Sequence, residues 1–183
     1  MKVYILYDEK NGQSEGAVSA LGDWAARKGH EVLVDNASEM HLKACIGCFG
    51  CWIKTPGICA LGDDDGKRYL KRFVTSDLMM LVTQIPFGSY SPAIKRALDR
   101  GIPSLLPFFR IYQGEMHHVQ RYKQKRRILH IPYGDFSGEE FETFTELARA
   151  HCDNAESPHA STQFGYKGDG NALADWVENE VKQ

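Results

Sequence analysis

Four of the five cysteines lie within a short stretch, and their spacing is the clearest sign of chemistry in this sequence. Cys45, Cys48 and Cys51 are separated by two residues each, and Cys59 follows after seven more. Thiolates ligate iron–sulfur clusters, and consecutive C-x2-C spacings place three sulfurs on one tight turn. Cys59, which follows a Pro56-Gly57 turn, can supply a fourth ligand. The spacing therefore predicts a [4Fe–4S] site at Cys45, Cys48, Cys51 and Cys59.

Two other interpretations of these cysteines stay open. Zinc is one, although zinc sites usually have two separated C-x2-C pairs rather than three cysteines at consecutive spacings. The other is that no metal binds, and that the thiols are buried in a packing loop or act as redox groups. Structural disulfides are disfavoured in a reducing compartment. The fifth cysteine, Cys152, stands alone and is expected to be a small core residue.

Residues 11–14 follow the first expected strand and have the composition of a phosphate-binding turn. Such a turn uses backbone N–H groups, hydroxyls and the positive end of a helix dipole. Gly12 permits close approach, and Gln13 and Ser14 supply side-chain donors. The same residues also suit an ordinary loop-to-helix junction, and the carboxylates of Asp8 and Glu9 disfavour a bound phosphate.

The loop after the third expected strand is rich in small residues. Gly88, Ser89 and Ser91 permit close approach of a planar ring whose edge bonds to backbone groups. Phe87 and Tyr90 can pack on the faces of such a ring. The alternative is a plain Gly/Ser turn with Phe87 in the core.

Together, these stretches resemble a known family. Residues 86–91 (Pro-Phe-Gly-Ser-Tyr-Ser), followed by Lys95 and Asp99-Arg100, resemble the P-x-(Y/F)-G-S-x-S…K…D-R pattern of flavodoxin-like NAD(P)H-dependent FMN reductases. Residues 11–14 (Asn-Gly-Gln-Ser) are similar to the N-G-N-T phosphate loop of that family. The cysteine spacing is similar to that of its iron–sulfur flavoprotein branch. The resemblance covers residues 1–100 by motif and the rest by the alternation of elements.

This resemblance implies a homo-oligomeric FMN protein that takes electrons from NAD(P)H or from a redox protein, with any iron–sulfur cluster lying near the flavin. By position it assigns the phosphate to Asn11, Gln13 and Ser14. The isoalloxazine ring is assigned to Pro86, Phe87, Gly88, Ser89, Tyr90 and Ser91, and the third side of the pocket to Gly134, Asp135 and Phe136. The chain departs from the family at residues 6–9 (Leu-Tyr-Asp-Glu), where relatives have Gly-Ser and a basic residue, and this disfavours tight FMN binding.

The elements that must position these loops alternate along the chain. Strands are expected at 3–7, 30–34, 78–82, 127–131 and 161–164, and helices at 14–28, after an acidic cap at 63–65, and at 92–100, 139–151 and 171–181. This alternation predicts an α/β fold with a parallel sheet. We expect a flavodoxin-like, three-layer α/β/α architecture with five strands in the order 2-1-3-4-5, whose ligand lies at the topological switch point. A cysteine-rich loop at 45–59 and a polar insertion near 101–126 interrupt it.

Composition excludes several classes of protein. A chain of 183 residues with 43% apolar and 25% charged residues predicts a single globular domain spanning 1–183 rather than a disordered chain. The net charge of -2 offers no electrostatic case for binding nucleic acid or an anionic membrane. The longest apolar runs are too short to span a bilayer, and no signal-peptide pattern follows Met1. These features predict a cytoplasmic protein.

The predicted function is an FMN-binding oxidoreductase that passes electrons from NAD(P)H to a quinone, a flavin or a protein acceptor. One alternative is an iron–sulfur flavoprotein that carries electrons without turnover of its own. Another is a flavodoxin-like binding or regulatory module that has lost FMN. Because a flavin supplies the redox chemistry itself, no side chain is assigned as a catalytic acid or base. No Ser/His/Asp arrangement or H-E-x-x-H motif supports hydrolysis.

Overall fold

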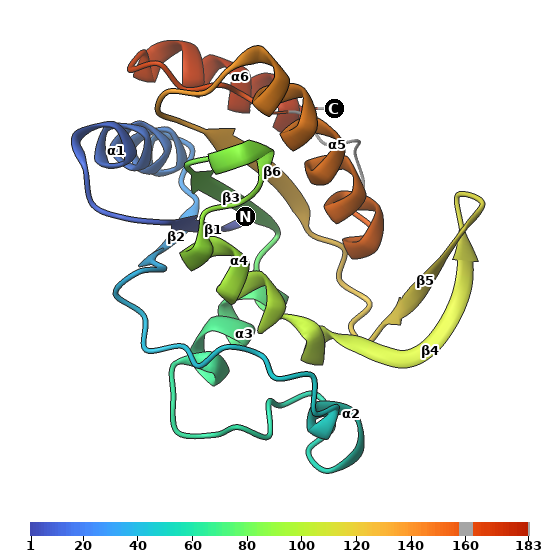
Figure 1. Ribbon diagram of the computed structural model, residues 1–183. Coiled ribbons are helices and arrows are strands. Elements are labelled where there is room, and N and C mark those ends of the chain that lie inside the picture. The colour runs from blue at the N-terminus through green and yellow to red at the C-terminus, as the bar shows by residue number, and fades with distance from the viewer. Residues whose placement is uncertain (158–162, 183) are drawn as a thin grey trace.

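The computed structural model has a parallel sheet at its centre, and it describes residues 1–157 and 163–182. Four strands pair in the order β2-β1-β3-β6 (Figure 1): β1 (Lys2–Tyr7), β2 (Glu31–Asn36), β3 (Leu78–Thr83) and β6 (Arg127–Pro132). Strand β3 is buried along its whole length, and β1 and β6 are buried except at their first residue. Continuous burial of this kind is typical of central parallel strands that are covered on both faces.

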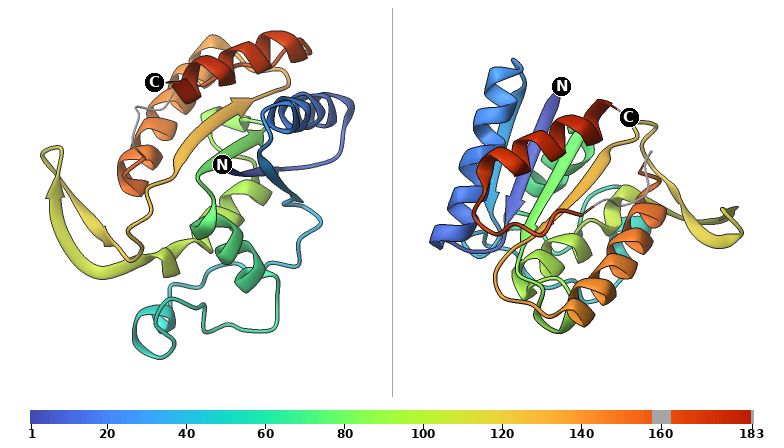
Figure 2. Two further views of the ribbon diagram at one scale, coloured as in Figure 1. Left: turned by 180° about the vertical axis from the view of Figure 1, so that it is seen from behind. Right: turned by 90° about the horizontal axis from the view of Figure 1, so that it is seen from above.

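Helices cover both faces of this sheet (Figure 2). Tyr4 and Leu6 of β1 pack in one apolar cluster with α3 (Gly66–Thr75), α4 (Pro92–Asp99) and α5 (Gly138–Ala155). Val3, Ile5 and Tyr7 point to the other face, where they pack with α1 (Gly12–Arg27) and α6 (Gly170–Lys182). The predicted three-layer α/β/α arrangement is therefore present. None of the helices in the described ranges is long and apolar enough to cross a membrane.

The predicted fifth strand is not confirmed. Residues 161 and 162 lie outside the described residues, and the segment that follows them makes only isolated parallel bridges to β6, His130 to Gln163 and Tyr133 to Tyr166. Pro132 lies between these bridges and its carbonyl accepts a hydrogen bond from the Tyr166 N–H. Because proline has no N–H to donate in return, a regular ladder cannot form on this side of β6.

The polar insertion predicted near 101–126 contains an ordered hairpin. After the short helix η2 (Ile102–Ser104), β4 (Leu105–Tyr112) and β5 (Glu115–Gln120) pair antiparallel and project from the body of the protein (Figure 1). Their turn residues, Gln113 and Gly114, both have positive φ, at 51° and 85°. A turn of this kind matches the twist of the strands it joins.

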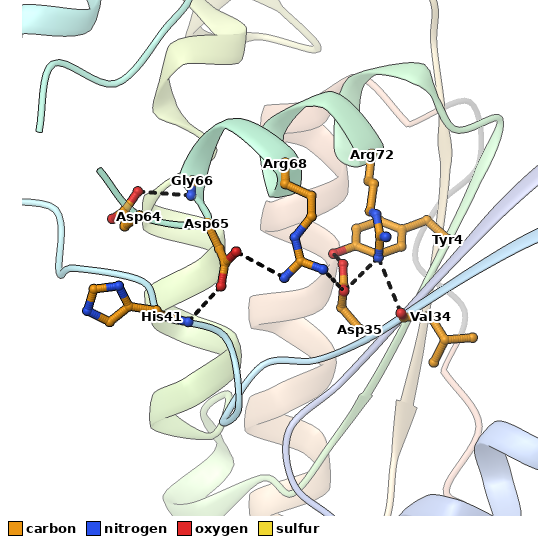
Figure 3. Close-up of polar contacts among 9 residues, drawn as sticks. All are labelled: Tyr4, Val34, Asp35, His41, Asp64, Asp65, Gly66, Arg68 and Arg72. Atoms are coloured by element: carbon orange, nitrogen blue, oxygen red, sulfur yellow. Dashed lines mark hydrogen bonds and ion pairs between the residues drawn. The ribbon is translucent and has the colours of Figure 1, made fainter. Parts of the chain in front are cut away.

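Two helix starts differ in detail from the prediction. Helix α1 is capped by Asn11, whose side chain accepts hydrogen bonds from the N–H groups of Gln13 and Ser14, and the Ser14 hydroxyl accepts one from the Asn11 N–H. Ser14, the first residue of the predicted helix, is thus the other half of a capping box. At α3 the predicted acidic cap acts through Asp64, whose carboxylate accepts a hydrogen bond from the Gly66 N–H (Figure 3).

An ion-pair network holds α3 against the sheet (Figure 3). Asp35, near the end of β2, accepts hydrogen bonds from Arg68 at 3.1 Å and from the hydroxyl of Tyr4 at 2.9 Å. Arg72 also pairs with this carboxylate, at 2.6 Å. Asp35 is only 6% exposed, so these partners take the place of the water that its side chain loses on burial.

Two histidines meet where α5 packs on the sheet: His130 of β6 is fully buried, and His151 of α5 is partly buried. The Tyr90 hydroxyl lies 3.0 Å from Nε2 of His130 and 3.0 Å from Nδ1 of His151. Burial, with a smaller effect of the Arg126 charge, lowers the pKa of His151 to about 4. Burial likewise holds the pKa of His130 well below its usual value. Both imidazoles are therefore neutral in the folded protein at mildly acidic pH.

This burial predicts a loss of stability in acid. Between pH 6.5, the ordinary pKa of histidine, and about 4, the unfolded chain binds a proton at His151 that the folded chain does not. The free energy of unfolding should fall by about 2 kcal/mol for this group between pH 7 and pH 5. Urea unfolding of His151→Gln at both pH values should show a smaller fall than the wild type, whereas His41→Gln, at an exposed histidine, should match the wild type. An unchanged fall in His151→Gln would contradict the prediction.

Candidate functional site

Three loops meet at the carboxyl edge of the sheet, after β1, β3 and β6. The Asp8 carboxylate accepts hydrogen bonds from the Gln84 N–H at 2.7 Å and from the Tyr133 hydroxyl at 2.6 Å. The Asn11 side-chain amide donates to the same Tyr133 hydroxyl, at 3.1 Å. Parallel strands end at the same edge, so residues far apart in the sequence become neighbours here. The three segments predicted to surround a cofactor therefore lie together.

Asp8 is the centre of this junction. It is 2% exposed, and it also accepts a hydrogen bond from the Glu9 N–H at 2.9 Å. Burial raises the pKa of Asp8, and the hydrogen bonds from Tyr133, Gln84 and Glu9 act in the opposite direction. Sequence reasoning did not find Gln84 and Tyr133, although each lies two residues after the end of a predicted strand. Their donors bind the protein's own carboxylate.

A second carboxylate, that of Glu9, lies next to Asp8 in the sequence. Glu9 is exposed, and its Oε1 accepts hydrogen bonds from the side chains of Gln84 at 2.6 Å and Asn11 at 3.2 Å. The neighbouring cation, Lys10, forms an ion pair with Glu39 at 2.8 Å. This acidic corner, formed by Asp8 and Glu9, therefore has no free lysine beside it in the described structure.

Most of the residues predicted to bind phosphate form hydrogen bonds within the protein instead. The side chains of Asn11 and Ser14 bond to the first turn of α1, and the Ser14 hydroxyl also donates to the Glu9 carbonyl at 2.6 Å. Gln13 is exposed, and Gly12 has open space around its α-carbon. As folded, this corner presents two carboxylates, which disfavour a phosphate dianion, and Arg96 is the cation in the wall of the same pocket.

The ring loop, which comprises residues 86–91 and is predicted to contact the flavin ring, is open to solvent at its tip. Phe87, in η1 (Pro86–Gly88), is 92% exposed, which rules out the alternative that it lies in the core. Its N–H donates to Glu140 Oε1 at 3.0 Å, and this contact ties the loop to α5. Gly88 has φ 71°, and a Cβ there would lie 2.6 Å from Thr143. Only glycine fits this close approach, so the loop holds Phe87 outward on a rigid base.

Tyr90 and Ser91 are placed differently from the prediction. Tyr90 is buried, its ring packs edge-on against Phe144 with centroids 5.2 Å apart, and its hydroxyl lies between the two histidines described above. It is a core residue and cannot cover a bound ring. Ser91 is the N-cap of α4. Of the predicted ring residues, Pro86, Phe87 and Ser89 are the exposed ones.

The loop predicted to form the third side of the pocket, residues 134–136, meets the other two loops at Gly134. This residue has φ 91°, and a Cβ there would lie 3.9 Å from the Gln84 side chain and 4.0 Å from that of Gln13. Asp135 is exposed. Phe136 stacks on Phe141 with centroids 5.6 Å apart. The structure thus brings Gln13, Gln84 and Gly134 together, with Phe136 packed against α5.

All four clustered cysteines line one cavity of about 360 Å³, together with Trp52, Arg100 and His118. Cys45 and Cys48 are exposed, Cys59 is half-buried, and Cys51 is buried. Burial raises the pKa of the Cys51 thiol, and the neighbouring thiols add to the effect. Across 1–157 and 163–182, no group of three or more Cys, His, Asp or Glu is arranged to hold a metal ion. The arrangement therefore does not support the predicted iron–sulfur cluster.

This cysteine cavity is also far from the ring loop within the chain. Part of its wall is formed at the end of α4 and just beyond it, by Asp99, Arg100, Ile102 and Pro103, whereas the ring loop precedes the start of the same helix. Eight helical residues separate the two by about 12 Å. The cysteine loop is anchored there by Arg100, which donates to both carboxylate oxygens of Asp64 at 2.6 and 2.9 Å.

Comparison with known proteins informs the fold alone. No family model and no curated protein sequence matches this chain. Solved structures do match. An NAD(P)H:quinone oxidoreductase from Methanothermobacter marburgensis has a TM-score of 0.67 and 13% sequence identity, covering 98% of this chain and 96% of its own. An NADH:FMN oxidoreductase, solved in its apo form, has a TM-score of 0.64 and 13% identity, covering 97% of this chain and 87% of its own.

A third similar structure is a flavodoxin. The flavodoxin of Streptococcus pneumonia TIGR4 has a TM-score of 0.55 and 12% identity, and the match covers all of this chain and 99% of that one. Its likeness extends over the whole sheet and its covering helices rather than over one motif. The resemblance inferred from the loops is therefore confirmed for the fold, and the chain has a flavodoxin-like α/β fold.

Proposed function

We propose that this protein is a flavin-dependent oxidoreductase that takes electrons from NAD(P)H and passes them to a small-molecule acceptor such as a quinone. The observation that carries the proposal is the loop with Phe87 held outward at the carboxyl edge of the sheet, opposite the Gly134 loop. Ligands of doubly wound sheets bind at this edge. The NAD(P)H:quinone oxidoreductase and the NADH:FMN oxidoreductase among the similar structures support the same choice.

The ring side of the site fits a flavin better than the phosphate side does. A bound flavin supplies hydride and single-electron transfer by its own chemistry. The exposed surface of Pro86, Phe87 and Ser89 offers an apolar and a polar contact for a planar ring. The acidic corner of Asp8 and Glu9 repels a phosphate. We therefore infer that the ring is the main point of attachment and that FMN is held weakly and exchanges.

The proposed acceptors are a quinone, a second flavin or a redox protein. The homo-oligomer that the resemblance implies stays a prediction. The β4–β5 hairpin offers a surface for it, because several large apolar side chains there are exposed, namely Phe108, Phe109, Ile111 and Met116.

One observation favours a second candidate, a flavodoxin-like binding or regulatory module that has lost its flavin. Asp8 already binds the Gln84 N–H and the Tyr133 hydroxyl, so donors of two loops are occupied before any ligand arrives. A module of this kind would keep the sheet and the loops and bind neither FMN nor riboflavin. The two candidates differ in flavin binding, which the next experiment measures.

Flavin binding should depend on Phe87. Quenching of flavin fluorescence should reveal binding to the wild type, and Phe87→Ala should weaken it about tenfold because a stacked aromatic contact is worth about 1 kcal/mol or more. Phe49→Ala removes an exposed phenylalanine from the cysteine loop and should bind flavin as the wild type does. Added FMN should also stimulate oxidation of NADH or NADPH with a soluble naphthoquinone. Absence of both quenching and flavin-stimulated oxidation would favour the second candidate.

The acidic corner should discriminate between flavins. Glu9→Gln removes an exposed charge next to the expected position of the phosphate, so the Kd for FMN should fall about threefold to fivefold. The Kd for riboflavin, which has no phosphate, should stay unchanged. Glu31→Gln removes a charge at the opposite edge of the sheet and serves as the control for net charge. Equal effects of Glu9→Gln on both ligands would show that the corner does not lie beside the phosphate.

A further inference from the structure

A second cavity, of about 410 Å³, lies between α4, α5 and the β4–β5 hairpin. It is separate from the acidic corner, although Ser89 and Tyr90 of the ring loop form part of its wall. Most of the wall is apolar, with side chains from these elements and from the neighbouring α3 and η2: Phe73, Leu98, Ile102, Leu105, Leu147, Ala150 and Ala155. A cavity of this size accommodates one small organic molecule.

Arg126 lines this cavity and is 3% exposed. Its ζ-carbon lies 4.1 Å from the centroid of the Phe73 ring. That contact is with the face of an aromatic ring, which offers no lone pair to the guanidinium N–H groups. The Arg126 Nε has no hydrogen-bond partner. The buried Nε donor of this cation therefore has no acceptor within the described part of the protein.

The nearby carboxylates have other partners. Asp99, which lines the same cavity, pairs with Lys95 at 2.5 Å. Glu156, buried after the end of α5, pairs with Arg110 and Lys125. Throughout the described ranges, Arg126 has no ion pair with a carboxylate, and residues 158–162 contain no Asp or Glu.

The same chain shows what a satisfied buried arginine looks like. Arg100 is 2% exposed and is bound by both oxygens of Asp64 and by the Lys43 carbonyl. Arg126 is equally buried and lacks all of these contacts. Burial lowers the pKa of Arg126 to about 10, so the guanidinium remains charged at neutral pH. A buried charge without a counter-ion is unfavourable, and such groups call for an explanation.

A second unused donor or acceptor lies in the same wall. Nδ1 of His118 is buried and has no hydrogen-bond partner. Its ring stacks near Phe109 of β4, with centroids 4.3 Å apart. The cavity thus combines an unpaired cation and an unpaired imidazole nitrogen with apolar walls, which is the pattern of a binding pocket with few orienting polar groups.

We propose that this cavity binds a small organic carboxylate with an apolar or aromatic body. The carboxylate would pair with Arg126, because the planar guanidinium matches two carboxylate oxygens. The body would lie against Leu98, Leu105 and Leu147. A single negative charge is preferred, since the Asp99 carboxylate in the same wall disfavours a second one. The proposal does not depend on flavin binding.

The test uses benzoate as the probe and benzamide as its neutral analogue, titrated into the full-length protein by calorimetry at constant ionic strength. Benzoate should bind the wild type at least tenfold more tightly than benzamide. Arg126→Met keeps the length and the apolar stem of the side chain, and it should weaken benzoate at least tenfold while leaving benzamide unchanged. Arg149→Met, at an exposed arginine of α5, should behave as the wild type. Inorganic phosphate, which has no apolar body, should bind more weakly than benzoate.

A second variant keeps the test valid if Arg126→Met does not fold. Ala150 is exposed on α5 and lines the cavity, so Ala150→Trp should fill it from the rim while Arg126 stays in place. This variant should lose benzoate binding and keep the wild-type Tm. Equal affinities for benzoate and benzamide, or undiminished benzoate binding by either variant, would overturn the proposal. In that case stacking on Phe73 alone would hold Arg126.

Discussion

The hydrogen bonds of one buried carboxylate join the loops on which the candidate site depends. Asp8 ends the first strand and accepts donors from Gln84 after β3 and from Tyr133 after β6. Because these donors lie where water has little access, a partner inside the protein is needed to satisfy them. The carboxylate meets that need and sets the relative positions of the three loops. It also makes the corner negative, which opposes a phosphate.

The candidate site therefore has two sides with opposite character. On one side, Gly88 packs so closely on Thr143 that the loop is rigid, and Phe87 is exposed for contact with a ring. On the other side, the carboxylates of Asp8 and Glu9 lie beside the loop that is predicted to bind phosphate. A rigid exposed aromatic group favours binding because little conformational freedom is lost on contact. The proposal that a flavin binds through its ring, with a weakly held tail, rests on this contrast.

Helix α4 separates the remaining features of interest. The ring loop precedes its first residue, and the cysteine cavity adjoins its last turn, where Arg100 and Asp64 form a buried ion pair. The cavity containing Arg126 lies along the side of this helix that faces α5 and the hairpin. Two arginines of equal burial thus have different surroundings, one with a carboxylate and one without. The contrast identifies the second cavity as the place where a ligand can supply what the chain does not.

The sequence by itself determined the alternation of strands and helices, the three loops at the carboxyl edge and the cysteine cluster, because periodicity, turn residues and spacing are local properties. Only the tertiary structure decided that Tyr90 is a core residue, since its neighbours His130 and His151 come from distant elements. The same holds for the partners of Asp8 and for the missing counter-ion of Arg126. The hairpin at 105–120 also depended on the pairing of its two strands. The fifth strand is incomplete because Pro132 interrupts pairing beside β6. Burial and pairing are set by residues far apart in the chain, so local patterns cannot specify them.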